Sequence, residues 1–236
     1  MQDLIRIVRG KIYPKPGKNM NSLSTAQAAS REKTLLVALL LSMWAPLATG
    51  IAVILSQSTT QLADFIRRSV ELVALFVSWF VFRTILRRKG IPESDKARLE
   101  RVASLLTAAA LVFSGLVILV VAVSRLADFE PGGNVYPGMV IAFLGLLTNT
   151  WFWRRYARQT RELYTPIIDA QAYLYRAKAF VDLCVLAALS AVAINPTHGI
   201  TRYVDLLGSG AVVVYLLWSG YNSARATINN KGVTHP

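Results

Sequence analysis

The chain has 236 residues, of which 54% are hydrophobic and only 17% are charged. A soluble domain usually carries about 25% charged residues, so the composition argues against an ordinary soluble domain. The net charge of +13 invites a nucleic-acid-binding interpretation, but the basic residues flank apolar runs and form no single basic face, so nucleic acid is not expected as a partner. The sequence instead predicts an all-α, polytopic membrane protein whose partner is the lipid bilayer.

Residues 1–34 are polar and basic, and they contain the breaker-rich stretch "YPKPGKN". No short apolar region with a small-residue cleavage site follows these charges, so the segment does not resemble a signal peptide. The first twelve residues fit a basic amphipathic helix on the membrane surface and a disordered tail equally well. We expect residues 1–34 to form a cytoplasmic basic N-terminal tail.

Six apolar runs follow, and each is long enough to cross a hydrocarbon core of about 30 Å. They must be helical, because backbone groups exposed to lipid have to satisfy their own hydrogen bonds. The sequence therefore predicts a six-helix transmembrane domain over residues 35–228, followed by a short cytoplasmic tail over residues 229–236. The expected spans are residues 35–55, 62–86, 102–126, 135–153, 172–194 and 204–223.

Lysine and arginine predict the orientation of these spans. The N-terminal tail has seven such residues, the segment 83–101 has seven, the segment 154–178 has six, and the C-terminal tail has two. The connections on the opposite side contribute Arg125 and Arg202 only. By the positive-inside rule, both termini are cytoplasmic in a multi-pass protein of the cell membrane, either plasma or inner.

The start of the second predicted span is unusually charged for a membrane helix. The stretch "QLADFIRRSVELVALFVSWFVF" contains Asp64, Arg67, Arg68 and Glu71. Arg67 and Glu71 are four positions apart and therefore share one helix face. Charges inside a membrane are costly and are usually paired or functional, which marks this helix as a candidate site.

The ordered set of spans resembles the cation diffusion facilitator family. "SQSTTQLADFIRRSVELVALF" is similar to the region joining the family's first and second spans, and "ARLERVASLLTAAALVFSGLVILVVAVSRL" to its third span, with Ala97 in place of a glycine. "TPIIDAQAYLYRAK" resembles the start of the fifth span, and "VDLLGSGAVVVYLLWSGYNSARATI" resembles the sixth. The likeness covers about residues 30 to 230.

This resemblance implies a six-helix bundle that exports divalent cations in exchange for protons, usually as a homodimer. Members often carry a cytoplasmic domain after the sixth span, and here we expect the membrane domain alone. The family holds its metal with Asp or His at two positions on span two and two on span five. In this sequence those four positions are occupied by Arg67, Glu71, Leu174 and Lys178.

This set departs from the family pattern, because Glu71 alone is an ordinary metal ligand. Leu174 has no donor atom, and Arg67 keeps its charge. A shifted register would pair Lys178 with Asp182, four residues further on, so Asp182 and Asp64 are accessory candidates. We assign no metal site, and we expect instead an ion pair between Glu71 and Lys178, with Arg67 paired to a nearby carboxylate.

Simpler roles remain open for several of these residues. Asp64 could cap its helix or lie at the membrane interface, and Arg67 and Arg68 could extend to the outer surface. Cys184, the sole cysteine, fits a packed core position, and His198 fits a surface loop. Small residues in the third and sixth spans, including Gly115, Gly208 and Gly210, would permit close helix approach.

No catalytic or cofactor motif is present, so the sequence predicts neither an enzyme nor a cofactor. Three functions remain. The first is cation transport by proton antiport, as the resemblance implies. The second is a transport-incompetent relative that acts as a structural or regulatory membrane subunit. The third is a transporter whose substrate is not a metal.

Overall fold

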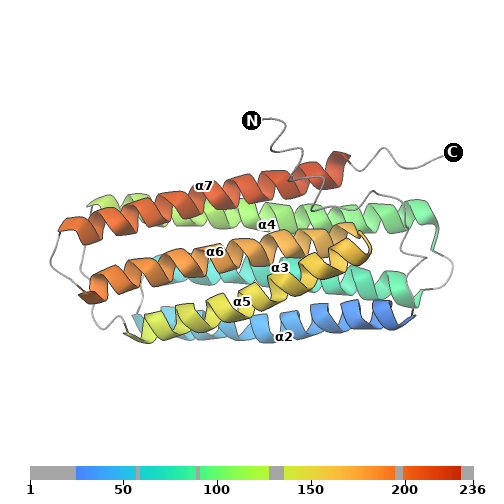
Figure 1. The fold of residues 1–236 in the computed structure, drawn as a ribbon, viewed down its shortest axis with the longest axis horizontal. Helices are drawn as coiled ribbons and strands as arrows, with labels where there is room; N and C mark the ends of the chain where they lie inside the picture. Colours follow the sequence, from blue (N-terminus) through green and yellow to red (C-terminus); the bar gives the residue numbers. More distant parts are fainter. Residues whose placement is uncertain (1–24, 57–58, 89–90, 128–135, 195–198, 230–236) are drawn as a thin grey trace.

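The fold is an all-α bundle of long helices in a computed structural model, which describes residues 25–56, 59–88, 91–127, 136–194 and 199–229. Within these ranges there are six helices (Figure 1). They are α2 (Thr25–Ser56), α3 (Thr59–Arg87), α4 (Glu93–Ala127), α5 (Tyr136–Glu162), α6 (Pro166–Ile194) and α7 (Gly199–Asn229). The all-α prediction is confirmed.

The helices are longer than the predicted apolar runs. The shortest, α5, has 27 residues and the longest, α4, has 35, which corresponds to about 40 to 50 Å of helix. The part of α5 beyond the predicted end at residue 153 carries several arginines, so a polar helical extension continues the apolar part. By length and hydropathy, two helical stretches of the described residues could cross a membrane on their own, Phe65–Arg87 and Glu93–Ser124.

The bundle has an apolar exterior. Every described helix exposes large hydrophobic side chains, and Trp44, Ile54, Val120 and Leu207 each expose more than two thirds of their surface. A soluble monomer seldom exposes so many large apolar side chains together, whereas lipid favours apolar side chains on the outside. This surface suits contact with a bilayer.

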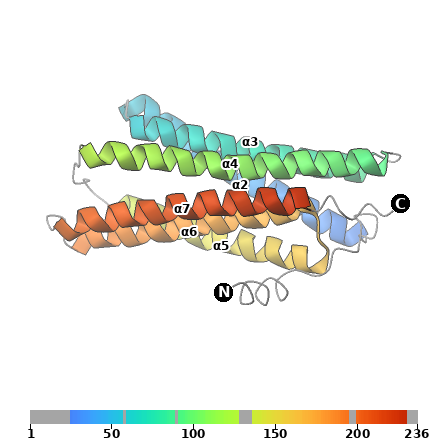
Figure 2. The same ribbon diagram turned by 90° about the horizontal axis from the view of Figure 1, so that it is seen from above.

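Helix α6 is shared by two internal apolar clusters. One joins α2, α3, α4, α5 and α6 around Leu75, Phe82, Tyr156 and Tyr175. The other joins α4, α6 and α7 around Leu111, Leu174 and Leu216. Figures 1 and 2 show α4 lying alongside α7 and α5 alongside α6, and the beginning of α2 lies toward the same end of the bundle as the end of α7.

Helix α2 begins ten residues before the expected first span. Arg31, which we placed in the N-terminal tail, is only 2% exposed. Its guanidinium donates hydrogen bonds to the carbonyl oxygens of Gln159 and Leu163 and, at 3.3 Å, to the Thr165 hydroxyl. Arg31 therefore caps the carboxyl end of α5, where carbonyl groups have no partner within the helix.

Glycine permits close contact between α4 and α7, but not at every position that we expected. A Cβ at Gly115 would lie 3.2 Å from Leu216, and one at Gly220 would lie 2.7 Å from Val112. Gly208 and Gly210 have nothing within 4 Å of that position, so the expectation that they permit close approach in this chain is wrong. The spacing of small residues does not tell which face of α7 meets its neighbour.

Candidate functional site in the helix bundle

The candidate site is built around Glu71, a buried carboxylate on α3. Lys178 on α6 places Nζ 3.1 Å from Glu71 Oε2, and Arg67 places a guanidinium nitrogen 3.1 Å from Glu71 Oε1. Ser114 on α4 donates a hydrogen bond of 2.8 Å to the same Oε1. Three helices therefore meet at one carboxylate, and the expected ion pair between Glu71 and Lys178 is present.

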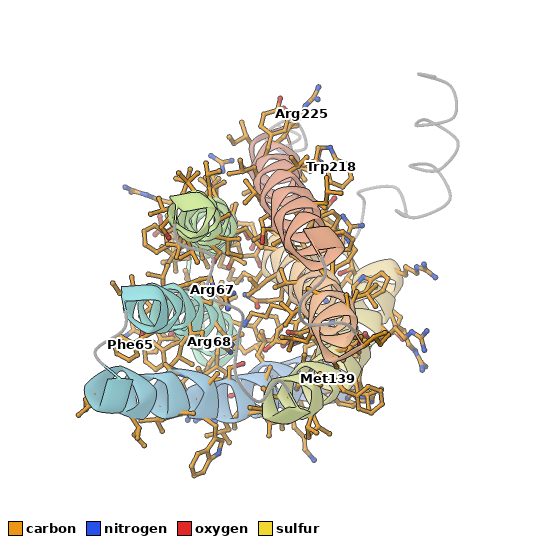
Figure 3. The ribbon with its side chains drawn as sticks, turned by 90° about the vertical axis from the view of Figure 1, so that its left-hand side faces the viewer. Phe65, Arg67, Arg68, Met139, Trp218 and Arg225 are labelled. Atoms are coloured by element: carbon orange, nitrogen blue, oxygen red, sulfur yellow. The ribbon has the colours of Figure 1, made fainter. Side chains whose placement is uncertain are left out.

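All three charged side chains of this site are largely shielded. The side chains of Glu71, Arg67 and Lys178 are 5%, 12% and 17% exposed. Figure 3, which views the bundle from the end where α3 begins, places Arg67 and Arg68 among the helices, whereas Trp218 and Arg225 lie at the rim. Arg67 thus points into the bundle and does not extend to the outer surface, and the carboxylate it pairs with is Glu71 of its own helix.

Asp182 forms a second acidic position on α6, one turn beyond Lys178. Asn149 of α5 donates a hydrogen bond of 2.7 Å to Asp182 Oδ2. Gly145, one turn earlier on α5, leaves the space that the Asp182 carboxyl occupies, because a Cβ there would lie 2.8 Å from Oδ2. Arg68, Lys178 and Arg67 are close enough to interact electrostatically with Asp182.

Of the remaining predicted positions, Leu174 is not brought to Glu71. Leu174 is fully buried in the apolar cluster of α4, α6 and α7. The side chain of Asp64 lies outside the described residues. Within the part of the chain that the structure describes, no group of three or more His, Cys, Asp or Glu side chains is arranged to hold a metal ion.

A second polar layer lies on the same three helices. Gln171 of α6, which is 0% exposed, donates hydrogen bonds to Ser78 of α3 at 3.0 Å and to Thr107 of α4 at 3.2 Å. Each of these residues is seven positions from a member of the Glu71 layer, which is about 10 Å along a helix. Two polar layers therefore stack along the seam between α3, α4 and α6, and the Gln171 layer lies toward the end where α2 begins.

Sequence reasoning assigned no role in a polar layer to the neutral members of either layer. Ser114 and Thr107 lie in an apolar run, where single hydroxyl groups are common and often bond to their own helix. The seven-residue spacing of these hydroxyls is the one signal that could have been used, because it places them on one face of α4. No such spacing singles out Asn149, the hydrogen-bond partner of Asp182 on α5.

The arrangement defines a class of protein, namely a helical membrane domain with charges buried between its helices. Residues 35–230 match the cation efflux transmembrane domain family, and the chain belongs to that family. The resemblance seen in the sequence is thereby confirmed. The comparison with curated proteins gives no match. Members of the cation efflux family are cation transporters of membranes and not enzymes.

Proposed function

We propose that this chain exchanges a cation for protons at Glu71, with Lys178 as a resident cation that the cargo displaces. The observation that carries this proposal is the 3.1 Å contact between Lys178 Nζ and Glu71 Oε2 in the bundle interior. A carboxylate that already holds an ammonium group accepts another cation only if that ammonium group leaves or loses its charge. We retain in this proposal the six predicted membrane spans and the predicted cytoplasmic location of both termini.

The chemistry of the two basic partners differs. A lysine ammonium can release a proton when its surroundings change, whereas an arginine guanidinium stays charged. Binding of a cation at Glu71 would favour release of the Lys178 proton, because two positive charges would otherwise compete for one carboxylate. Arg67 would remain as a fixed charge that holds one oxygen of Glu71. Entry of one cation would then be coupled to loss of one proton.

The local charge favours a singly charged cargo. Around the site, Glu71 and Asp182 contribute two negative charges, and three basic side chains contribute three positive ones: Arg67, Arg68 and Lys178. After Lys178 loses its proton, these charges balance. A divalent ion would add two positive charges to that balance without the carboxylates that such ions prefer. The divalent metals that the family implies are therefore a second choice of cargo.

The two polar layers offer a path for the cargo. The hydroxyl and amide groups of Ser78, Thr107 and Gln171 lie between the Glu71 layer and the end of the bundle where α2 begins. Gln171 Oε1 is buried and has no hydrogen-bond partner among the residues that the structure describes. A neutral oxygen of this kind can solvate a passing cation or proton.

The test is cation flux in proteoliposomes under an imposed pH gradient. Sodium, potassium, zinc, manganese, iron, cobalt and cadmium are tested against empty vesicles. We expect flux above the empty vesicles, loss of flux in Glu71→Gln, and loss of its dependence on the pH gradient in Lys178→Arg. Glu162→Gln is the matched control, because its carboxylate pairs with Arg158 at the surface and should not affect flux.

A second function is favoured by one specific observation. Both oxygens of Glu71 are occupied, since Arg67 and Ser114 hold Oε1 while Lys178 holds Oε2. If these contacts are permanent, the chain is a transport-incompetent relative with a structural or regulatory role. Absence of flux with every cation, from protein that is folded and inserted, would refute the exchange proposal and support this one. The homodimer that the family implies is tested separately by the mass of the purified protein.

A further inference from the structure

A cavity of about 140 Å³ lies between α5 and α6, away from Glu71. Its α5 wall includes Trp153, Thr160 and Arg161, and its α6 wall includes Asp169, Tyr173 and Arg176. The spacing on each helix places these residues on one face. The two helices are antiparallel and are joined by residues 163–165, so Arg161 and Asp169 lie near the connection and Arg176 lies about two turns further along.

Two lining residues of this cavity each have a buried polar atom without a hydrogen-bond partner among the described residues. Thr160 is 3% exposed, and its hydroxyl has no hydrogen-bond partner. The Nε atom of Arg176 is also buried without a partner. An unsatisfied buried polar group costs about 1 to 3 kcal/mol, so a polar ligand that reached either group would be stabilised there.

The basic residues of the cavity keep their charge for a ligand, although the Arg176 side chain also forms a hydrogen bond with the Tyr215 hydroxyl. Among the described residues, neither Arg161 nor Arg176 forms an ion pair with a carboxylate within 4.0 Å. The Arg176 guanidinium lies 5.1 Å from the centre of the Tyr173 ring, 5.8 Å from that of Tyr215 and 5.9 Å from that of Trp218. These cation–π contacts hold the guanidinium in place without neutralising its charge.

The single carboxyl group of the described lining is Asp169, which precedes the apolar run that begins at residue 172. Burial raises the pKa of Asp169 to about 7, although the charge of Arg176 acts in the opposite direction. Near neutral pH this group is therefore protonated in a substantial fraction of molecules. A protonated carboxyl group donates a hydrogen bond and does not repel an anion.

We propose that this cavity binds a phosphate group through Arg161, Arg176 and the Thr160 hydroxyl. Guanidinium and hydroxyl groups are donors that phosphate oxygens accept well. The volume is several times the roughly 30 Å³ of one water molecule, which leaves room for a phosphate group. The phosphate would come from a phospholipid headgroup or from free phosphate in solution.

Two features favour the lipid as the source. Trp153 and Tyr173 line the cavity, and amphipathic aromatic rings of this kind lie at membrane interfaces. Arg161 is exposed and therefore gives the cavity access to the outside of the bundle. Basic pockets between membrane helices on the cytoplasmic side are known to hold lipid headgroups.

The test measures the thermal unfolding midpoint of the full chain in an uncharged detergent. Phosphatidylglycerol is compared with diacylglycerol of the same chains, which lacks the phosphate, and with inorganic phosphate at constant ionic strength. We expect phosphatidylglycerol to raise the midpoint by several degrees more than diacylglycerol. A rise with inorganic phosphate at submillimolar concentration would instead identify free phosphate as the source.

Variants separate binding from general destabilisation. Arg161→Gln should raise the half-saturating concentration of the phosphate ligand at least tenfold, and Thr160→Val should raise it severalfold. Arg158→Gln is the matched control, because Arg158 lies on the same helix, is exposed and pairs with Glu162. Arg161 is exposed, so Arg161→Gln should leave the fold intact.

The proposal is overturned if neither ligand stabilises the protein beyond diacylglycerol. It is also overturned if Arg161→Gln and Arg158→Gln weaken binding equally, because the effect would then be one of net surface charge. The readout is independent of cation flux, so its failure is distinguishable from failure of the exchange proposal.

Discussion

Replacing Glu71 with glutamine removes the charge of the buried carboxylate and leaves the shape of the side chain nearly unchanged. Glutamine is nearly the same size and can still accept the hydrogen bond from Ser114, but it cannot neutralise Lys178. The Lys178 side chain is 17% exposed, so its ammonium group would keep its charge in a poorly solvated position. Removing one partner of a buried ion pair costs about 3 to 5 kcal/mol.

Partial exposure reduces this cost. Lys178 Nζ also lies 5.3 Å from the centre of the Tyr175 ring, and that contact survives the change. We therefore expect Glu71→Gln to lower the free energy of unfolding by about 3 kcal/mol, at the lower end of the range for buried pairs. Lys178→Met in the same chain should restore at least half of the loss, because it removes one of the two cations that Glu71 neutralises.

The assay is reversible unfolding in mixed micelles at several denaturant concentrations, for both single variants and the double variant. The control Glu162→Gln breaks an exposed pair of 3.2 Å with Arg158 and should cost less than about 1 kcal/mol. If Glu71→Gln costs no more than this control, the ion pair contributes little to stability, and the central role given to Lys178 is wrong. If the two effects simply add in the double variant, the residues are not energetically coupled.

Three further predictions use the same unfolding assay. Arg31→Met should lower the free energy of unfolding by about 2 to 4 kcal/mol, because it removes charge-assisted hydrogen bonds to buried carbonyl groups, and a loss below 1 kcal/mol would contradict this account. Gly220→Ala should lower the free energy of unfolding by about 1 to 3 kcal/mol, because the added methyl group forces α4 and α7 apart. Gly210→Ala is the control and should be neutral or slightly stabilising, because a Cβ there meets no described atom within 4 Å. Equal effects of the two changes would refute the packing argument. The pKa of Asp169 is raised from 3.8 to about 7, so between these pH values the folded state holds a proton that the unfolded state releases. The free energy of unfolding should therefore fall by up to a few kcal/mol as the pH rises from about 4 to 7. Asp169→Asn should remove this pH dependence.

The charged part of the candidate site was predictable because charge is rare inside apolar runs. Arg67 and Glu71 share a helix face by their spacing, and Lys178 is the cation at the matched position on the partner helix. The sequence did not show that both cations contact the same carboxylate. That outcome depends on how α3, α4 and α6 rotate about their axes, which is set by packing over the whole bundle.

Residues outside the apolar runs were harder to place. Arg31 lies in a basic segment for which the sequence predicts a solvated tail. It is instead buried against the end of α5, more than 120 residues away in the chain. Its burial depends on the free carbonyl groups at that helix end, and no local pattern near Arg31 reports them. The cavity between α5 and α6 escaped prediction for a similar reason, because Thr160 and Arg176 become neighbours only through the antiparallel pairing of the two helices.

The position of Arg31 has a mechanical consequence for any motion that opens the bundle. The guanidinium joins α2 to the connection between α5 and α6, and Arg155 of α5 also donates a hydrogen bond of 2.9 Å to Thr34 of α2. Separating α2 from α5 would expose all of these groups at once. We therefore expect α2 and α5 to stay together at the end of the bundle where α2 begins, which is called the clamped end below. Rearrangement around Glu71 would then pivot about this clamped end, with the largest displacement at the opposite end, where Arg67 and Arg68 lie.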